Sequence, residues 1–259
     1  MAKPISWVLF DVGNVLVCDD PSMAMLYRMI HDAVREVRPE TTFHEILAER
    51  ERLIREERQG RPWSALAKRR LGNNGWRRIK RDFLTILESE YEKYNIPVPG
   101  ADSVLASVSE RYRLAVAANQ TRACRLALER LDWMRYFSEF WISEEVGASK
   151  PSQVFFTGLL GRIQCPPEEC VMIGDRIDAD ITPAKALGMH AILVKSRFDE
   201  LERPVFDERD QLYYENLGRV RVGDSDPAES DRVPDVVLGS LSDLPDFLTR
   251  YRMEPDDGR

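Results

Sequence analysis

Short apolar runs alternate with amphipathic stretches through most of this chain, and that alternation restricts the possible folds most. The apolar runs, each four to six residues long, lie at 7–11, 113–118, 140–143, 171–174, 190–194 and 235–238. Stretches with helical periodicity lie between or after them, at about 101–111, 122–131, 152–163, 179–188 and 243–251. Such runs are typical of buried strands, and helices between strands connect parallel neighbours. The pattern predicts an α/β fold with a Rossmann-like parallel sheet.

Residues 20–97 interrupt this alternation. Four helical patterns without a strand-like run fill them, at 22–37, 43–58, 62–71 and 76–94, and Pro97-Val98-Pro99-Gly100 ends the block. We therefore predict a core formed by 1–19 and 98–259, with 20–97 inserted as an all-helical cap. The polar stretch 196–234 is predicted to be a long loop, an unusual length for a connection within a compact domain.

Length, charge and cysteine content exclude several classes of protein. The 259 residues suffice for a full hydrophobic core, and the net charge of −7 argues against affinity for nucleic acid or a membrane surface. No apolar stretch approaches the roughly 20 residues needed to span a bilayer, and the N-terminus runs directly into the first predicted strand without a secretory signal. Four scattered cysteines indicate reduced thiols rather than a disulfide scaffold. We expect a cytoplasmic protein; its oligomeric state is not indicated.

Charged residues follow the predicted strands in a distinctive order. Asp11 ends the first apolar run, Lys150 precedes Pro151, Asp175 follows the run 171–174, and Asp180 comes five residues later. The carboxyl ends of parallel strands meet at the sheet edge where open α/β folds bind their ligands. Two strand-end carboxylates, a lysine and a further Asp at one such edge indicate a site that handles a phosphoryl group.

Four segments together resemble the four motifs of the haloacid dehalogenase superfamily, most of whose members are Mg²⁺-dependent phosphatases. The segments are Phe10-Asp11-Val12-Gly13-Asn14-Val15-Leu16, Leu114-Ala115-Val116-Ala117-Ala118-Asn119, Gly147-Ala148-Ser149-Lys150-Pro151 and Gly174-Asp175-Arg176-Ile177-Asp178-Ala179-Asp180. The resemblance covers nearly the whole chain. It implies the superfamily's core fold with a helical cap of the C1 type, and a small phosphorylated molecule as substrate.

The same resemblance implies roles for individual residues. Asp11 would be the nucleophile that forms an aspartyl-phosphate, and Lys150 would supply positive charge to the nucleophile and the transferring oxygens. Asp180 would either support the metal's waters or orient Lys150. The implied Mg²⁺ site consists of Asp11, the backbone carbonyl of Gly13, Asp175 and Asp180, and the implied substrate contacts come from Asn14, Asn119 and Lys150.

Two positions depart from the superfamily's usual pattern. Gly13 stands where phosphatases of this kind usually carry a second Asp as general acid and base, and Ala118 stands where a Ser or Thr usually contacts the phosphate. A glycine transfers no proton, so another group would have to do so, and Asp19 and Asp20 are the nearest acids in the sequence. Their alternative role is to form the hinge and cap the helix that follows.

Three functions stay open on this basis. The first is a Mg²⁺-dependent phosphohydrolase acting on a small phosphorylated metabolite. The second is a protein that binds a phosphorylated ligand or partner without turning it over, which Gly13 and Ala118 favour. The third is a 2-haloacid dehalogenase, which needs no acid at position 13; the resemblance argues against it, because the metal-free dehalogenases lack an acidic pair like the one at Asp175.

Overall fold

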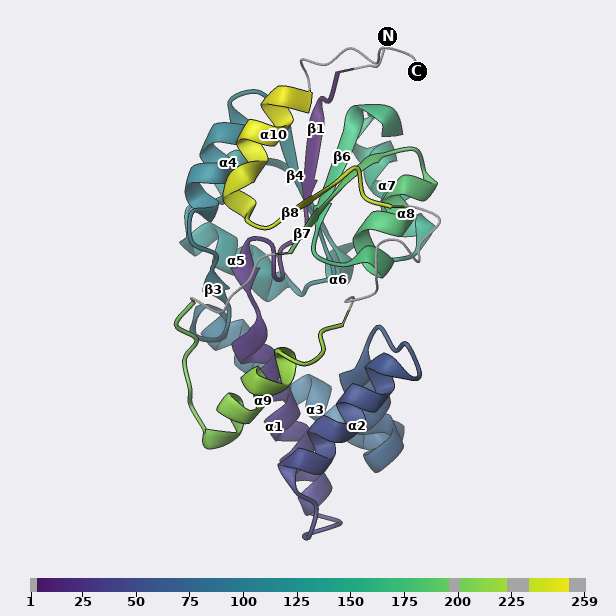
Figure 1. Ribbon diagram of the computed structural model, residues 1–259, viewed down its shortest axis with the longest axis vertical. Coiled ribbons are helices and arrows are strands. Elements are labelled where there is room, and N and C mark those ends of the chain that lie inside the picture. The colour runs from purple at the N-terminus through teal and green to yellow at the C-terminus, as the bar shows by residue number, and fades with distance from the viewer. Residues whose placement is uncertain (1–3, 196–200, 223–232, 252–259) are drawn as a thin grey trace. The chain divides into compact units, whose positions relative to one another are not determined.

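Six parallel strands form the main sheet, in the order β5-β4-β1-β6-β7-β8 (Figure 1). The strands are β1 (Trp7–Phe10), β4 (Arg113–Ala118), β5 (Phe137–Ile142), β6 (Cys170–Gly174), β7 (His190–Val194) and β8 (Val236–Leu238). The predicted α/β class with a parallel sheet is confirmed. The largest difference in a boundary is at β5, which begins three residues before the predicted run 140–143.

The computed structural model describes residues 4–195, 201–222 and 233–251. The chain divides into two units. One contains 1–18, 97–200 and 225–259, and holds the six-stranded sheet; the other contains 19–96 and 201–224, and is helical. We call them the core unit and the helical unit. None of the described helices is both long enough and apolar enough to cross a membrane.

The central strands of the core unit are buried along their whole length. All four residues of β1 and all five of β6 are buried, as expected for parallel strands with helices on both faces. The helices of this unit are α4 (Ala101–Ser109), α5 (Arg122–Arg130), α6 (Ser143–Val146), α7 (Gln153–Ile163), α8 (Thr182–Ala186) and α10 (Leu244–Tyr251). In Figure 1, α4 and α10 lie on one side of the sheet and α7 and α8 on the other. Phe155, Phe156 and Leu159 of α7 pack with Leu9 and Met172 of the strands.

The helical unit is built from α1 (Asp20–Arg35), α2 (Phe43–Arg55), α3 (Pro62–Tyr94) and α9 (Glu208–Leu217). Local signals explain where these helices begin: Pro21 and Pro62 occupy first turns, and Thr42 with Glu45 forms a capping box for α2. The segment α3 is two helices joined at Gly72, whose φ of 71° is readily adopted only by glycine. This break lies between the predicted helices 62–71 and 76–94.

The stretch 196–234, predicted to be a long polar loop, contains a helix. Residues 208–217 form α9, which begins with a capping box of Asp207 and Asp210 and buries Tyr213, Tyr214 and Leu217 in the core of the helical unit. Its apolar stripe is short, so periodicity alone did not reveal it, and its burial depends on partners far away in the sequence. Parts of the predicted loop, 196–200 and 223–232, lie outside the described residues.

A small two-stranded sheet was also not predicted. It pairs β2 (Val17–Cys18) with β3 (Ile96–Pro97), so the end of the segment 20–97 does contain strand structure. Two-residue strands leave no periodicity in a sequence, because their pairing is defined only by the partner.

Candidate active site

Asp11 lies at the carboxyl end of the central strand β1. Its backbone N–H donates to the carbonyl of Ile173 on β6 at 2.9 Å, so the ladder between the two strands continues through this residue. Its Oδ1 accepts a hydrogen bond of 2.8 Å from the N–H of Val12, and 13% of its side chain is exposed. The carboxylate is therefore fixed at a sheet edge and still reachable from solvent.

Lys150 joins Asp11 to Asp180. Its Nζ lies 2.9 Å from Oδ1 of Asp11 and 2.5 Å from Oδ1 of Asp180, and its side chain is 1% exposed. Burial by itself would lower the pKa of Lys150, but the two carboxylates outweigh burial and raise that pKa above its usual value. The ammonium group therefore keeps its charge at neutral pH.

Asp180 is fully buried behind this lysine. Its Oδ2 accepts a hydrogen bond of 3.1 Å from the backbone N–H of Arg176, at the start of a π-helical turn over Ile177–Ile181. A Cβ at Gly174 would overlap the side chain of Asp180, so only glycine lets the carboxylate take this position. Burial raises the pKa of Asp180 to about 6, although Lys150 acts in the opposite direction.

Three carboxylates gather at the edge formed by β1 and β6. Each of Asp11, Asp175 and Asp180 places one oxygen within 4.8 Å of the others. A fourth acid, Asp178, lies beside them and accepts hydrogen bonds of 2.9 and 2.5 Å from Arg176. The four carboxylates together with Lys150 and Arg176 carry a net charge of −2. Oxygen ligands with excess negative charge are what a hard divalent cation prefers. The residues present thus fit a metal site.

Gly13 and Asn14 form the turn after Asp11. The N–H of Asn14 donates to the carbonyl of Val17 at 2.6 Å, and Asn14 has a φ of 56°, which asparagine tolerates better than most residues. The side-chain Oδ1 of Asn14 is buried and has no hydrogen-bond partner among the described residues. The substrate contact expected of Asn14 stays a prediction.

Asn119 does something that the sequence did not indicate. It follows the last residue of β4, the buried Ala118, and its side-chain amide pairs with the backbone of Lys150. Oδ1 accepts from the N–H of Lys150 at 2.8 Å, and Nδ2 donates to the carbonyl of Lys150 at 2.9 Å. No local pattern announces this contact, since 31 residues separate the two.

Asp20, considered above as a substitute acid or base, has other partners. Its buried carboxylate accepts hydrogen bonds from Arg203 and Arg221, all three residues belonging to the helical unit. Two guanidinium groups thus bind this carboxylate by charge-assisted hydrogen bonds. The geometry favours the structural role for Asp20.

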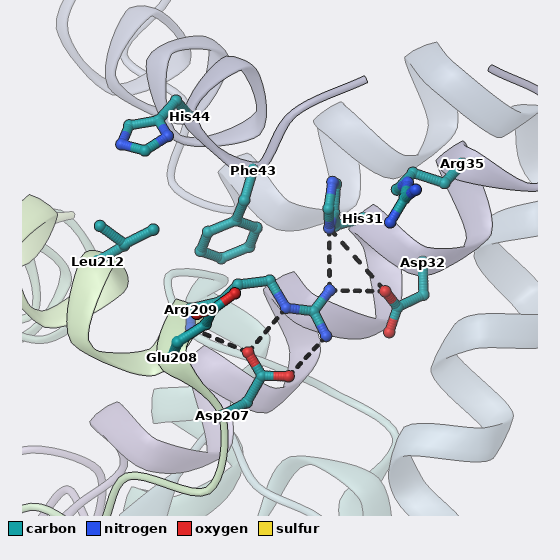
Figure 2. A pocket seen from close by; sticks show the side chains of 9 residues that line it. All are labelled: His31, Asp32, Arg35, Phe43, His44, Asp207, Glu208, Arg209 and Leu212. Carbon is teal, nitrogen blue, oxygen red and sulfur yellow. Dashed lines mark hydrogen bonds and ion pairs between the residues drawn. The ribbon is translucent and has the colours of Figure 1, made fainter. Parts of the chain in front are cut away.

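A pocket of about 770 Å³ opens in the helical unit, between α1 and the first turns of α2 and α9 (Figure 2). Arg209 lines this pocket, and Figure 2 shows the Arg209 guanidinium turned toward His31, Asp32 and Asp207. Nε2 of His31 lies 3.0 Å from the carbonyl of Thr41, which can only accept, so this nitrogen carries the proton and Nδ1 accepts from Arg209 at 2.9 Å. Arg209 is thus paired with both Asp32 and Asp207 in the wall of the pocket.

Comparisons with known proteins bear on this arrangement. A family model for haloacid dehalogenase-like hydrolases matches residues 5–188. A stretch of 109 residues is 39% identical to glyceraldehyde 3-phosphate phosphatase of Methanothermobacter thermautotrophicus, covering 41% of this chain and 48% of that protein. A stretch of 154 residues is 32% identical to ribulose-1,5-bisphosphate 5-phosphatase of Halopiger xanaduensis, covering 59% of this chain and 56% of that protein. The chain thus spans about half the length of these curated relatives.

Solved structures share the fold over a longer range. The crystal structure of a HAD phosphatase from Thermococcus onnurineus superposes with a TM-score of 0.61, over 94% of this chain and 98% of that one. The sequence identity is 20%, so this similarity supports the fold alone.

Proposed function

The chain belongs to the haloacid dehalogenase-like hydrolase family, and from this premise we propose that it is a Mg²⁺-dependent phosphatase acting on a small phosphorylated metabolite. One observation carries the proposal. Nζ of Lys150 contacts the carboxylates of Asp11 and Asp180 together, beside Asp175, at the carboxyl edge of the sheet. A nucleophile, a fixed cation and a cluster of oxygen ligands for a metal therefore share one place.

The proposed reaction has two steps. A carboxylate oxygen of Asp11 forms a bond to phosphorus while the bond from phosphorus to the leaving oxygen breaks, and the leaving oxygen keeps the electron pair and takes up a proton. Water then attacks phosphorus, the bond to Asp11 breaks, and inorganic phosphate leaves. Lys150 stabilises the negative charge on the transferring oxygens from a buried position, where such a charge acts strongly.

A bound Mg²⁺ would offset the repulsion between Asp11 and the anionic substrate. Asp11, Asp175 and the carbonyl of Gly13 are the proposed ligands. Both oxygens of Asp180 already accept hydrogen bonds, one from Lys150 and one from the N–H of Arg176. Of the two roles left open for Asp180, this geometry favours the orientation of Lys150.

Gly13 implies a preference among substrates. Without a carboxylic acid at this position, the leaving oxygen takes its proton from another source, such as water or the substrate itself. We therefore infer that turnover depends steeply on the leaving group, because general acid catalysis normally contributes roughly 10²–10⁴-fold. Two of the relatives are phosphatases of glyceraldehyde 3-phosphate and ribulose 1,5-bisphosphate, which supports a small metabolite as the class of substrate.

The test is phosphate release from p-nitrophenyl phosphate, phenyl phosphate and a panel of metabolite phosphates, with Mg²⁺ or with EDTA. We expect release that requires Mg²⁺, is abolished in Asp11→Asn, and is much faster for p-nitrophenyl phosphate than for phenyl phosphate. Gly13→Asp should speed the phenyl ester at least tenfold relative to the nitrophenyl ester, because it supplies the acid. The φ of Gly13 is not among the positive ones, so the backbone tolerates this change.

A second candidate function is favoured by the same glycine together with Ala118: binding of a phosphorylated ligand without turnover. Absence of phosphate release from every substrate, in protein that still binds Mg²⁺ by calorimetry, would replace the phosphatase by this binding function. Release that persists in Asp11→Asn would contradict the proposed nucleophile.

A further inference from the structure

We infer that Asn119 is a positioning residue, which places Lys150 for the proposed phosphoryl transfer by holding its backbone. The inference rests on the proposed function, which makes Lys150 catalytic. It assigns to Asn119 a role distinct from the substrate contact that the sequence suggested.

The segment around Lys150 has little other support from secondary structure. Lys150 lies in a turn between the end of α6 at Val146 and the start of α7 at Gln153, outside any helix or strand. The residue after it, Pro151, has no N–H to donate. Both hydrogen-bonding groups of the Lys150 backbone are taken by the Asn119 side chain, at 2.8 and 2.9 Å.

Asn119 itself stands on a rigid support. It directly follows β4, which pairs with β1 on one side and β5 on the other, so its backbone is anchored to the sheet. Asp11 follows β1 in the same way. Asn119 therefore fixes the turn that carries Lys150 to the same sheet that carries the nucleophile.

The position of Nζ depends on this connection. The Lys150 side chain is buried, with Nζ 2.9 Å from Asp11 and 2.5 Å from Asp180, so a displacement of its backbone changes both distances. Misplacing a catalytic group by about 1 Å can cost 10²-fold in rate. Asn119 is itself exposed, so water can replace its hydrogen bonds when it is removed. Loss of the amide should therefore affect catalysis much more than stability.

Asn119→Ala tests this inference in the whole 259-residue chain, with Gln120→Ala as the matched control. The backbone carbonyl of Gln120 accepts from Ser143 and Glu144, and an alanine keeps that contact. For Asn119→Ala we expect kcat with p-nitrophenyl phosphate to fall roughly 10- to 100-fold, with KM changed by less than about threefold. The midpoint of thermal unfolding of Asn119→Ala should move by no more than about 4 °C. Gln120→Ala should match the wild type in kcat, in KM and in the unfolding midpoint.

A second measurement does not depend on activity. Hydrogen exchange at the Lys150 amide should become at least about tenfold faster in Asn119→Ala, since the N–H loses its acceptor, and should stay unchanged in Gln120→Ala. If the wild type releases no phosphate, the proposed function fails, and this exchange still decides whether Asn119 holds Lys150.

Three results would overturn the inference. A raised KM with unchanged kcat would make Asn119 a substrate contact instead. A large fall in the unfolding midpoint, with activity lost in proportion to folded protein, would make its role merely structural. Unchanged exchange at Lys150 would show that the backbone is held without Asn119.

Discussion

Asp20 and Arg221, 201 residues apart in the chain, form a two-point ion pair within the helical unit. Nη1 of Arg221 donates to Oδ1 of Asp20 and Nη2 donates to Oδ2, each at 3.0 Å. Arg203 adds a third hydrogen bond to Oδ2 at 2.9 Å. One carboxylate at the start of α1 thus holds the chain on both sides of α9.

Asp20→Asn should destabilise the protein because it removes this charge but keeps the size of the side chain. The carboxylate is 3% exposed, and its loss leaves two guanidinium groups without their counter-ion in a partly buried place. We expect the free energy of unfolding in urea to fall by roughly 2–3 kcal/mol. Asp102→Asn is the control: Asp102 is 56% exposed beside Arg135, and its change should stay within about 0.5 kcal/mol. Equal effects of the two substitutions would contradict the structural role of Asp20.

Arg209 should make the stability of the helical unit depend on pH. It donates to both oxygens of Asp207, at 2.9 and 2.8 Å, and these hydrogen bonds hold the pKa of Asp207 well below its usual range despite partial burial. An acid whose pKa is lower in the folded state stabilises that state above its ordinary pKa of about 4, and the contribution is lost as the pH falls below that value.

Arg209→Gln should therefore reduce the stability lost on acidification. Between pH 7 and pH 3, its free energy of unfolding in urea should fall by about 1 kcal/mol less than that of the wild type, a modest amount because Asp207 is partly exposed to solvent. Arg162→Gln, which alters a surface pair with Glu139, is the control and should follow the wild-type curve. Parallel curves for wild type and Arg209→Gln would refute the contribution of this pair.

Gly174→Ala should disturb the proposed metal site, because Asp175, one of the proposed ligands, directly follows Gly174. The new methyl group would overlap the Asp180 side chain and force it or the strand to shift, at a cost of about 1–3 kcal/mol in stability. Mg²⁺ affinity measured by calorimetry should fall with it. Gly161→Ala in α7 is a matched control, because nothing lies within 4 Å of its new Cβ, and it should stabilise the protein by about 0.5–1 kcal/mol. Unaltered Mg²⁺ affinity in Gly174→Ala would show that the metal site does not depend on this glycine.

Lys150→Gln should separate catalysis from metal binding. Removal of the buried ammonium should lower kcat roughly 10²–10³-fold, as removal of one charge-stabilising donor does in other active sites. Mg²⁺ should bind at least as tightly, because the proposed ligand Asp11 loses its competing cation. Kinetics and calorimetry on the same preparation decide this, and a loss of Mg²⁺ affinity as large as the loss of rate would show that Lys150 serves mainly to assemble the metal site.

Much of the core unit could be predicted because its signals are local. A run such as Val171–Gly174 is apolar throughout, as expected for a strand buried on both faces, and its end at Asp175 marks the edge of the sheet. Parallel order then brings Asp11 and Asp175 together, because their strands are neighbours. The break in α3 at Gly72 falls in the gap between the predicted helices 62–71 and 76–94, because the glycine that permits it is a local signal.

Other features could not be predicted, because they depend on pairs of residues far apart in the chain. Tyr213 is a polar-tipped aromatic in a stretch with weak periodicity. Its stacking on Tyr27, with ring centroids 5.2 Å apart, is one of the contacts that make α9 part of the helical unit. The family resemblance had implied that Asn119 contacts the substrate. Its contact with Lys150 required the fold to bring two turns together.

The sequence by itself determined the class of fold and the chemical character of the site, because hydrophobic periodicity and strand-end residues act over a few neighbouring positions. The tertiary structure alone decided which groups meet: Lys150 with Asp11 and Asp180, Asn119 with the Lys150 backbone, and Asp20 with Arg203 and Arg221. These contacts follow from the packing of whole helices and strands. The sequence pattern is compatible with many other pairings of the same charged residues. Only the three-dimensional arrangement selects one of them.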